Sequence, residues 1–242
     1  MGKRVKPYAL YGSRRPRKIT FGGNRDKGFP GERDCGSTPR EPTNMQQDTD
    51  FLLPPDLPRP NDDGASDHLR GKAIPKICLP STFGGLVDLS QLSVPRTVIY
   101  CYPMTGVPGK PLPKGWDAIP GARGCTPQTR GFQEHYGELL ELQVEVFGLS
   151  TQTIEYQREM ANRLNLPFQI LSDSEFKFCD ALRLPTFEVE GMRLVKRLTL
   201  VIRSGRIEHV FYPVFPPNES ADQVLQWLEG HPVGRSITPV TD

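Results

Sequence analysis

The chain lacks the patterns that mark several common protein classes. No window of about 18 uninterrupted apolar residues predicts a membrane span, and no apolar stretch near Met1 predicts a secretory signal. The five cysteines form no Cys-x-x-Cys pair and show no metal-ligand spacing, which disfavours a dithiol redox motif, a zinc site and a disulfide framework. We therefore expect a cytoplasmic protein with free thiols, no bound metal and no contact with a membrane.

Acidic residues are nearly absent from the first 30 positions. This stretch holds nine Lys or Arg and one Asp, whereas the remainder holds 21 basic and 27 acidic residues. Ser13-Arg14-Arg15-Pro16 is similar to the start of a twin-arginine export signal. No apolar core follows it, so we do not expect export. We expect instead a disordered basic arm whose contact with nucleic acid is at most weak and non-specific.

Regular periodicity is also absent from Met1 to about Arg70. The chain has 25 prolines and 23 glycines, so much of it should form loops, and the proline-rich residues 53–60 predict an extended strap. We expect three parts: the arm and strap at 1–70, one folded domain at 71–230, and a flexible tail at 231–242.

The predicted domain alternates apolar, β-rich runs with amphipathic helical patterns. The runs predict strands at 97–102, 144–149, 168–171, 197–202 and 207–212, the last two joined at Ser204-Gly205. The helical patterns cover about 125–142, 150–166, 172–182 and 219–229. This order, βαβα followed by a β-hairpin and a final helix, predicts an α/β, thioredoxin-like fold with a central mixed sheet flanked by helices.

Cys125 is the most informative residue. It follows a turn rich in Gly and Pro at 119–124 and opens a predicted helix, with Pro127 at an early helical position where its missing N–H costs nothing. The positive end of a helix dipole stabilises a thiolate, and right-handed crossovers would put this loop at the carboxyl end of a central strand. We therefore expect a nucleophilic thiol; the alternative is an inert, buried cysteine.

Five segments resemble peroxiredoxins of the Bcp (bacterioferritin-comigratory) or Q type and related redoxin-domain proteins of the alkyl hydroperoxide reductase and thiol-specific antioxidant superfamily. The resemblance covers about 75–229. The matching segments are Tyr102-Pro103, Gly124-Cys125-Thr126, Phe-Gly-Leu-Ser-Thr at 147–151, Leu-Ser-Asp at 171–173, and Arg-Leu-Thr-Leu-Val-Ile at 197–202.

The resemblance implies a thiol-dependent peroxidase that reduces hydrogen peroxide or small organic hydroperoxides. Cys125 would attack the peroxide and become a sulfenic acid, while Arg197 would steady the thiolate and the substrate. Pro103, Arg123 and Gly124 would support the site. No metal, haem or flavin cofactor is implied. The implied partners are the peroxide and a thioredoxin- or glutathione-type reductant. A homodimer is a further possibility that the sequence leaves open.

Two departures from the family pattern concern the site. The family has Thr three residues before its cysteine, where this chain has Ala122, and an insertion at about 104–119 separates Pro103 from the site. The hydroxyl would then come from Thr126 or Thr105, or be absent. These departures leave open a second hypothesis, a redox-sensing or interaction protein on the same fold with little peroxidase turnover.

Resolution of the oxidised cysteine is also left open. The Q type often has a resolving cysteine five positions after the nucleophile, where this chain has Arg130. Cys101 and Cys179 both lie in predicted core elements, and Cys179 is the better resolving candidate of the two. Cys35 and Cys78 fall in the irregular arm or at its junction with the domain.

Overall fold

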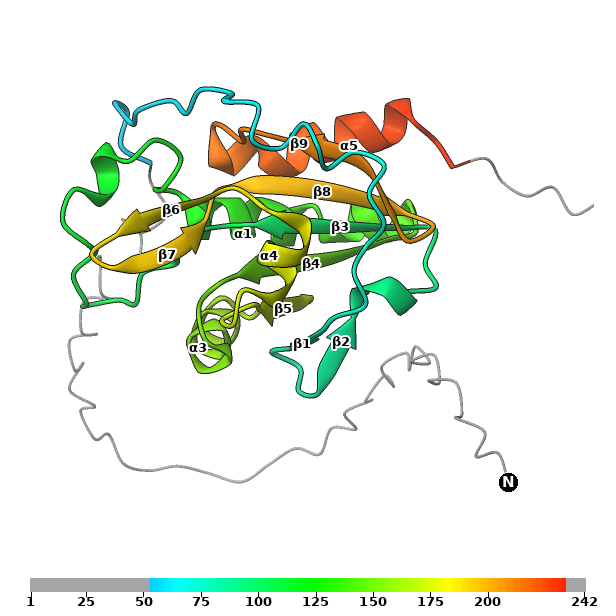
Figure 1. The fold of residues 1–242 in the computed structure, drawn as a ribbon, viewed down its shortest axis with the longest axis horizontal. Helices are drawn as coiled ribbons and strands as arrows, with labels where there is room; N and C mark the ends of the chain where they lie inside the picture. Colours follow the sequence, from blue (N-terminus) through cyan, green and yellow to red (C-terminus); the bar gives the residue numbers. More distant parts are fainter. Residues whose placement is uncertain (1–52, 234–242) are drawn as a thin grey trace, which may run out of the picture. The chain divides into compact units, whose positions relative to one another are not determined.

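The computed structural model describes residues 53–233 (Figure 1). The predictions for the basic arm, its weak contact with nucleic acid, Cys35 and the tail from 234 onward lie outside these residues. Within the described range, no helix is long and apolar enough to cross a membrane.

The core of the fold is a mixed five-stranded sheet in the order β5-β4-β3-β8-β9. β3 pairs in parallel with β4, which pairs in parallel with β5, whereas β8 and β9 are antiparallel to their neighbours. The strands are β3 (Arg96–Cys101), β4 (Val144–Ser150), β5 (Gln169–Ser172), β8 (Leu198–Arg203) and β9 (Arg206–Phe211). All six residues of β3 are buried, as expected for a central strand covered on both faces.

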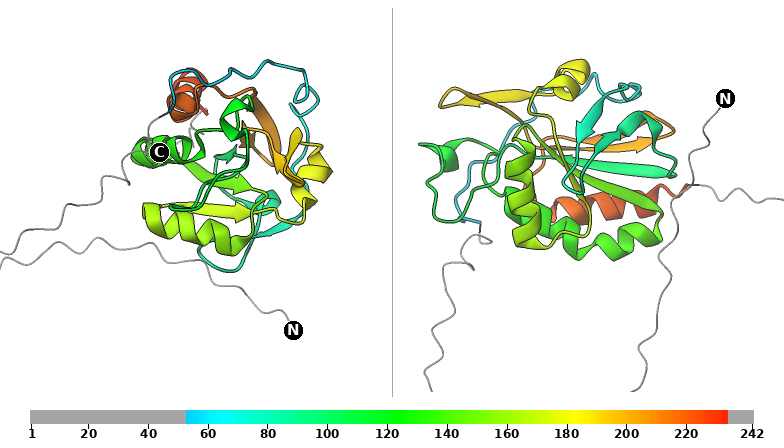
Figure 2. Two further views of the ribbon diagram at one scale, coloured as in Figure 1. Left: turned by 90° about the vertical axis from the view of Figure 1, so that its left-hand side faces the viewer. Right: turned by 90° about the horizontal axis from the view of Figure 1, so that it is seen from below.

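Helices cover both faces of the sheet, as the left view of Figure 2 shows. The helices are α1 (Cys125–Glu134), α2 (Tyr136–Glu141), α3 (Ile154–Leu164), α4 (Lys177–Leu182) and α5 (Ser220–Gly230). Phe132, Leu139, Met160 and Val224 place α1, α2, α3 and α5 on one apolar core. α4 and the segment from Leu69 to Leu89 pack on the opposite face. This arrangement confirms the predicted thioredoxin-like layout.

Several local predictions need correction. The single helix expected at 125–142 is broken at His135, whose ring contacts Glu138 at 3.1 Å and Asp222 of α5 at 3.0 Å. Gly137 also weakens helix propensity there. Arg197 lies just before β8 rather than inside a strand.

Short elements went unpredicted. They are the hairpins β1 (Cys78–Pro80) with β2 (Leu86–Asp88) and β6 (Thr186–Val189) with β7 (Met192–Val195), and the 3-10 turns η2 (Leu89–Gln91), η3 (Trp116–Ala118) and η4 (Pro217–Glu219). β6 and β7 are joined by Glu190 and Gly191, both at positive φ, which is the backbone that a tight hairpin turn requires.

The proline-rich segment from 53 to 72 contains no helix or strand, yet it is held against the domain. Leu69 is fully buried, the His68 ring contacts the Leu182 carbonyl at 3.0 Å, and Gly71 N donates to the Ile207 carbonyl at 2.8 Å. Tertiary contacts therefore fix a segment that has no periodic pattern of its own.

Candidate active site

Cys125 is the first residue of α1, and its side chain is buried, with 4% exposed. Gly124 precedes it with φ 102°, a conformation that favours glycine. A Cβ at Gly124 would lie 2.9 Å from Leu53 Cδ2 and would overlap the Pro217 ring. The loop therefore approaches the helix through a position that only glycine fits, and the sulfur lies at the positive end of the α1 dipole.

Among the described hydrogen bonds, the guanidinium of Arg197 is the charged group that bonds to this sulfur. Its Nη2 donates to Cys125 Sγ at 3.1 Å, and the side chain is buried, with 3% exposed. The same Nη2 donates to the carbonyl oxygens of Ala122 at 3.0 Å and Arg123 at 3.1 Å, while Nε donates to that of Gly121 at 3.2 Å. Main-chain carbonyls of the loop thus fix a buried cation against the thiol.

Gln128 completes the ligation of this guanidinium. Its Oε1 accepts from Arg197 Nη1, and its Nε2 donates to Ser220 Oγ at 3.2 Å. The residue is fully buried one helical turn after Cys125. Sequence reasoning did not find it, although the i to i+3 spacing places it beside Cys125 on the helix and was the available signal.

Ala122 occupies the position where the family has a threonine. It is fully buried and packs in a small apolar cluster with Trp116 of the insertion and Leu194 of β7. Its carbonyl oxygen also accepts from the thiol of Cys125 at 3.6 Å. The insertion therefore packs against the place that a threonine side chain would need.

The two hydroxyls expected to replace that threonine have different surroundings. Thr105 Oγ1 donates to Gln152 Oε1 at 3.3 Å, and its N–H donates to the same atom at 3.0 Å. Thr126, which is buried, directly follows Cys125 in the first turn of α1.

The supporting residues contribute through their main chains. The Pro103 carbonyl accepts from Ser150 Oγ at 3.1 Å, which fixes the end of β3 to β4. The Arg123 carbonyl accepts from Arg197, whereas the Arg123 guanidinium pairs with Asp117 at 3.4 Å. Arg123 therefore contacts the site with its backbone rather than with its charge.

Buried aromatic side chains line the inner side of Cys125. Tyr100, Tyr102 and Phe132 share its apolar cluster, and the Tyr100 and Phe132 rings stack at 4.4 Å. Burial raises the pKa of Tyr100 and of Tyr102, so both phenols stay protonated, and Tyr102 donates to Gln157. Cys125 thus packs within a buried cluster of uncharged aromatic side chains.

The other described cysteines have different environments. Cys101 and Cys179 are fully buried, and this burial raises the pKa of each thiol. Cys78 is exposed on β1. No group of three or more metal-binding side chains comes together in residues 53–233.

Comparison with known proteins agrees with this geometry. The Redoxin family model matches residues 69–225. Over 165 residues, the chain is 30% identical to peroxiredoxin Bcp of Escherichia coli K12, covering 66% of this chain and 96% of that protein. It is 25% identical over 160 residues to the chloroplastic peroxiredoxin Q of Sedum lineare, covering 66% of this chain and 77% of that one.

A solved structure shows the same fold. Peroxidoxin BcpB from Mycobacterium tuberculosis superposes with a TM-score of 0.56 at 24% identity, covering 68% of this chain and 99% of its own. The family match spans well over half of the chain, and the similarity to the E. coli protein extends over nearly all of that protein. The chain therefore belongs to the redoxin family and, within it, to the Bcp/Q-type peroxiredoxins, which are thiol-dependent peroxidases.

Proposed function

We propose that Cys125 is the peroxidatic nucleophile and that Arg197 stabilises both its thiolate and the peroxide. The observation that supports this assignment is the 3.1 Å hydrogen bond from Arg197 Nη2 to Cys125 Sγ at the N-terminus of α1. A guanidinium and a helix N-terminus both favour negative charge on the sulfur. The same two positive groups favour the charge that develops on the peroxide oxygens.

The reaction is a two-electron oxidation of the sulfur. The Cys125 thiolate attacks the terminal oxygen of a hydroperoxide ROOH, the S–O bond forms as the O–O bond breaks, and RO⁻ leaves. RO⁻ takes up a proton to become ROH, and the enzyme is left with the sulfenic acid Cys–SOH. With hydrogen peroxide, R is hydrogen and the second product is water. The buried setting of Cys125 separates this step from bulk solvent.

An external thiol then restores the enzyme. A first thiol condenses with Cys–SOH to give a mixed disulfide and water, and a second thiol releases Cys125 and leaves as the oxidised disulfide. We assign this role to a thioredoxin- or glutathione-type reductant. Cys179 is a poor resolving thiol in this conformation, because its burial raises its pKa and keeps it protonated.

A reducing, cytoplasmic compartment suits this cycle. Cys78, Cys101, Cys125 and Cys179 are all free thiols, which is the usual state of cysteines in such a compartment.

The test compares wild type with Cys125→Ser. Consumption of hydrogen peroxide and cumene hydroperoxide is followed with thioredoxin and its reductase, and separately with glutathione. We expect fast wild-type turnover that the substitution abolishes, with a dimedone adduct on Cys125 when the reductant is left out. A wild-type rate equal to that of free thiol would overturn the assignment and favour the redox-sensing hypothesis.

A further inference from the structure

Two parts of the chain that depart from the family pattern meet beside Cys125. The first is the strap, defined here as residues 53–63, which precedes the start of the Redoxin match at residue 69. The second is the insertion at 104–119, whose last residue, Ile119, begins the loop to Cys125. Both line one cavity of about 290 Å³, called here the strap pocket.

The strap pocket meets the candidate active site at Arg197. Arg197 and Gly121 both line it. The same Arg197 side chain bonds to the Gly121 carbonyl at 3.2 Å and to Cys125 Sγ at 3.1 Å. The cavity therefore borders the guanidinium that contacts Cys125, while Cys125 itself is not one of its lining residues.

Most of the lining is apolar. Ile119 comes from the insertion, Phe187 from β6 and Val214 from the segment after β9, while Pro60 and Asn61 form the strap side. An apolar cavity with few polar groups is the usual form of a small-molecule site.

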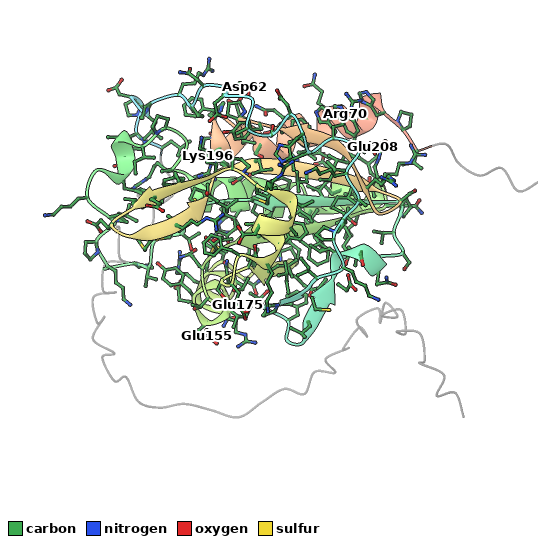
Figure 3. All side chains as sticks on the ribbon, viewed as in Figure 1. Asp62, Arg70, Glu155, Glu175, Lys196 and Glu208 are labelled. Carbon is green, nitrogen blue, oxygen red and sulfur yellow. The ribbon has the colours of Figure 1, made fainter. Side chains whose placement is uncertain are left out.

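Two of the three charged side chains of the wall, Lys196 and Asp63, are paired with each other. Lys196 Nζ contacts Asp63 Oδ2 at 2.7 Å, Tyr212 OH donates to Asp63 Oδ1 at 2.7 Å, and Lys196 Nζ donates to Tyr212 OH at 3.3 Å. Figure 3 labels Lys196 beneath the strap that carries Asp62. This cation and anion neutralise each other, so Arg197 is the one charged wall residue without a partner among the described salt bridges.

The strap is fixed at several points. Besides Asp63, the Arg59 guanidinium lies 5.4 Å from the centroid of the Phe215 ring. Pro60 lies beside Gly121, since a Cβ at Gly121 would be 3.5 Å from Pro60 Cγ. Figure 1 shows the strap, at the blue end of the coloured trace, starting near the green loop that precedes α1. The pocket wall is therefore preformed.

We propose that the strap pocket binds the apolar group of a compact organic hydroperoxide, and that Asn61 and Phe187 determine specificity for it. This inference rests on the proposed function of Cys125 and Arg197. The volume of about 290 Å³ is at the lower end of small-molecule pockets, about 300–1,000 Å³, so it suits one ring or a short branched chain. A long-chain fatty acid hydroperoxide exceeds this volume.

The first test is a substrate series on the wild-type chain. kcat/KM is measured for hydrogen peroxide, cumene hydroperoxide and linoleic acid hydroperoxide. We expect cumene hydroperoxide to be preferred over both others by about 10-fold or more, because hydrophobic pocket contacts discriminate by about 10–200-fold. Equal values, or a preference for hydrogen peroxide or for the long chain, would overturn the pocket assignment.

The second test fills the pocket from the strap. Asn61 is exposed, so Asn61→Trp adds an indole at the pocket wall without disturbing the core. The ratio of kcat/KM for cumene hydroperoxide to that for hydrogen peroxide should fall about 10-fold or more. Asp56→Trp is the matched control, because Asp56 is an exposed strap residue outside the pocket lining, and its ratio should equal that of wild type.

The outcomes separate the two proposals. If wild type turns over hydrogen peroxide through Cys125 while Asn61→Trp leaves the ratio unchanged, the strap pocket is wrong and the proposed function stands. If wild type consumes neither peroxide faster than free thiol, the proposed function fails and the pocket inference fails with it.

Discussion

Gln128 and Cys125 lie three residues apart on α1 and contact the same guanidinium. Gln128 accepts a hydrogen bond from Arg197 Nη1, and Cys125 Sγ accepts one from Arg197 Nη2. The amide of Gln128 is itself held, because its Nε2 donates to Ser220 Oγ on α5 at 3.2 Å. α5 is thereby connected to the sulfur through a chain of three buried polar side chains. Gln128 is thus a positioning residue for the guanidinium rather than a catalytic group.

Removing this positioning amide should slow the attack on peroxide. In Gln128→Ala, Arg197 Nη1 loses its side-chain partner, and kcat/KM for hydrogen peroxide should fall about 10- to 100-fold, since small misplacements of a catalytic group cost up to about 10²-fold. Gln128→Asn keeps an uncharged amide acceptor on a shorter side chain and should recover part of the rate. Equal losses in the two variants, at unchanged thermal stability, would contradict the positioning role.

Arg197 should contribute more than a positioning residue does. Arg197→Met removes the donor to Cys125 Sγ and should lower kcat/KM by about 10²–10³-fold, the usual effect of losing one donor to developing negative charge. Arg197→Lys keeps the charge but cannot reach Gly121, Ala122 and Cys125 together, so it should recover only part of the rate. Stopped-flow oxidation of Cys125 measures both variants, and full activity in Arg197→Met would exclude the role.

A cycle with a single cysteine has a direct chemical signature. Cys179→Ala and Cys78→Ala should both retain turnover with an external thiol. Burial raises the pKa of Cys179 and keeps that thiol protonated, and Cys78 lies exposed on β1. After one equivalent of peroxide, mass spectrometry should find Cys125 as a sulfenic acid or as its adduct with the added thiol. An intramolecular disulfide from Cys125 to Cys179, or to Cys35, would show a resolving pair instead.

The sequence predicted the fold well because its strands and helices have strong local periodicity. β3 contains the apolar run from Val98 to Cys101, and Cys125 directly follows a glycine at a helix start, so both could be found without tertiary information. The short hairpins were missed because strands of three or four residues carry too little alternation to detect.

The assembly of the site was less predictable. The contact between Arg197 and Cys125 was expected only from the family resemblance, because burial of a guanidinium by main-chain carbonyls leaves no local pattern. Gln128 looked like any polar helical residue. The pairing of Asp63 with Lys196 joins residues 133 positions apart, and such a contact depends on the whole fold.

The alanine at position 122 should be required by the insertion. Ala122→Thr adds a methyl and a hydroxyl to a fully buried site packed against Trp116 and Leu194, so it should destabilise the domain by about 1–3 kcal/mol through overpacking. Urea unfolding measures this loss. Ala122→Ser adds less volume and serves as the control, with a smaller loss. A threonine variant that is as stable as wild type and turns over faster would contradict this prediction, because it would mean that Trp116 and Leu194 can move to make room for the larger side chain.

The attachment of the strap should be insensitive to pH around neutrality. Hydrogen bonds from Lys196 and Tyr212 lower the pKa of Asp63 from its ordinary 3.8 to about 2, and burial is the main cause that raises the pKa of Tyr212 to about 12. A lowered carboxyl pKa gives stability that is complete above about 4 and is lost as the pH falls toward 2. The raised phenol pKa gives stability that is complete below about 10.

The difference in urea midpoint between wild type and Asp63→Asn should therefore be constant from pH 5 to 9 and shrink below about pH 4. Asp62→Asn is the matched control, because Asp62 Oδ1 accepts only from the Gly64 N–H among the described hydrogen bonds, at 3.0 Å, and an asparagine oxygen can accept that bond equally well. Its difference from wild type should stay small throughout. If the Asp63→Asn difference instead changed between pH 6 and 7, a group that titrates near neutrality would hold the strap, and the pairing of Asp63 with Lys196 would not be its main attachment.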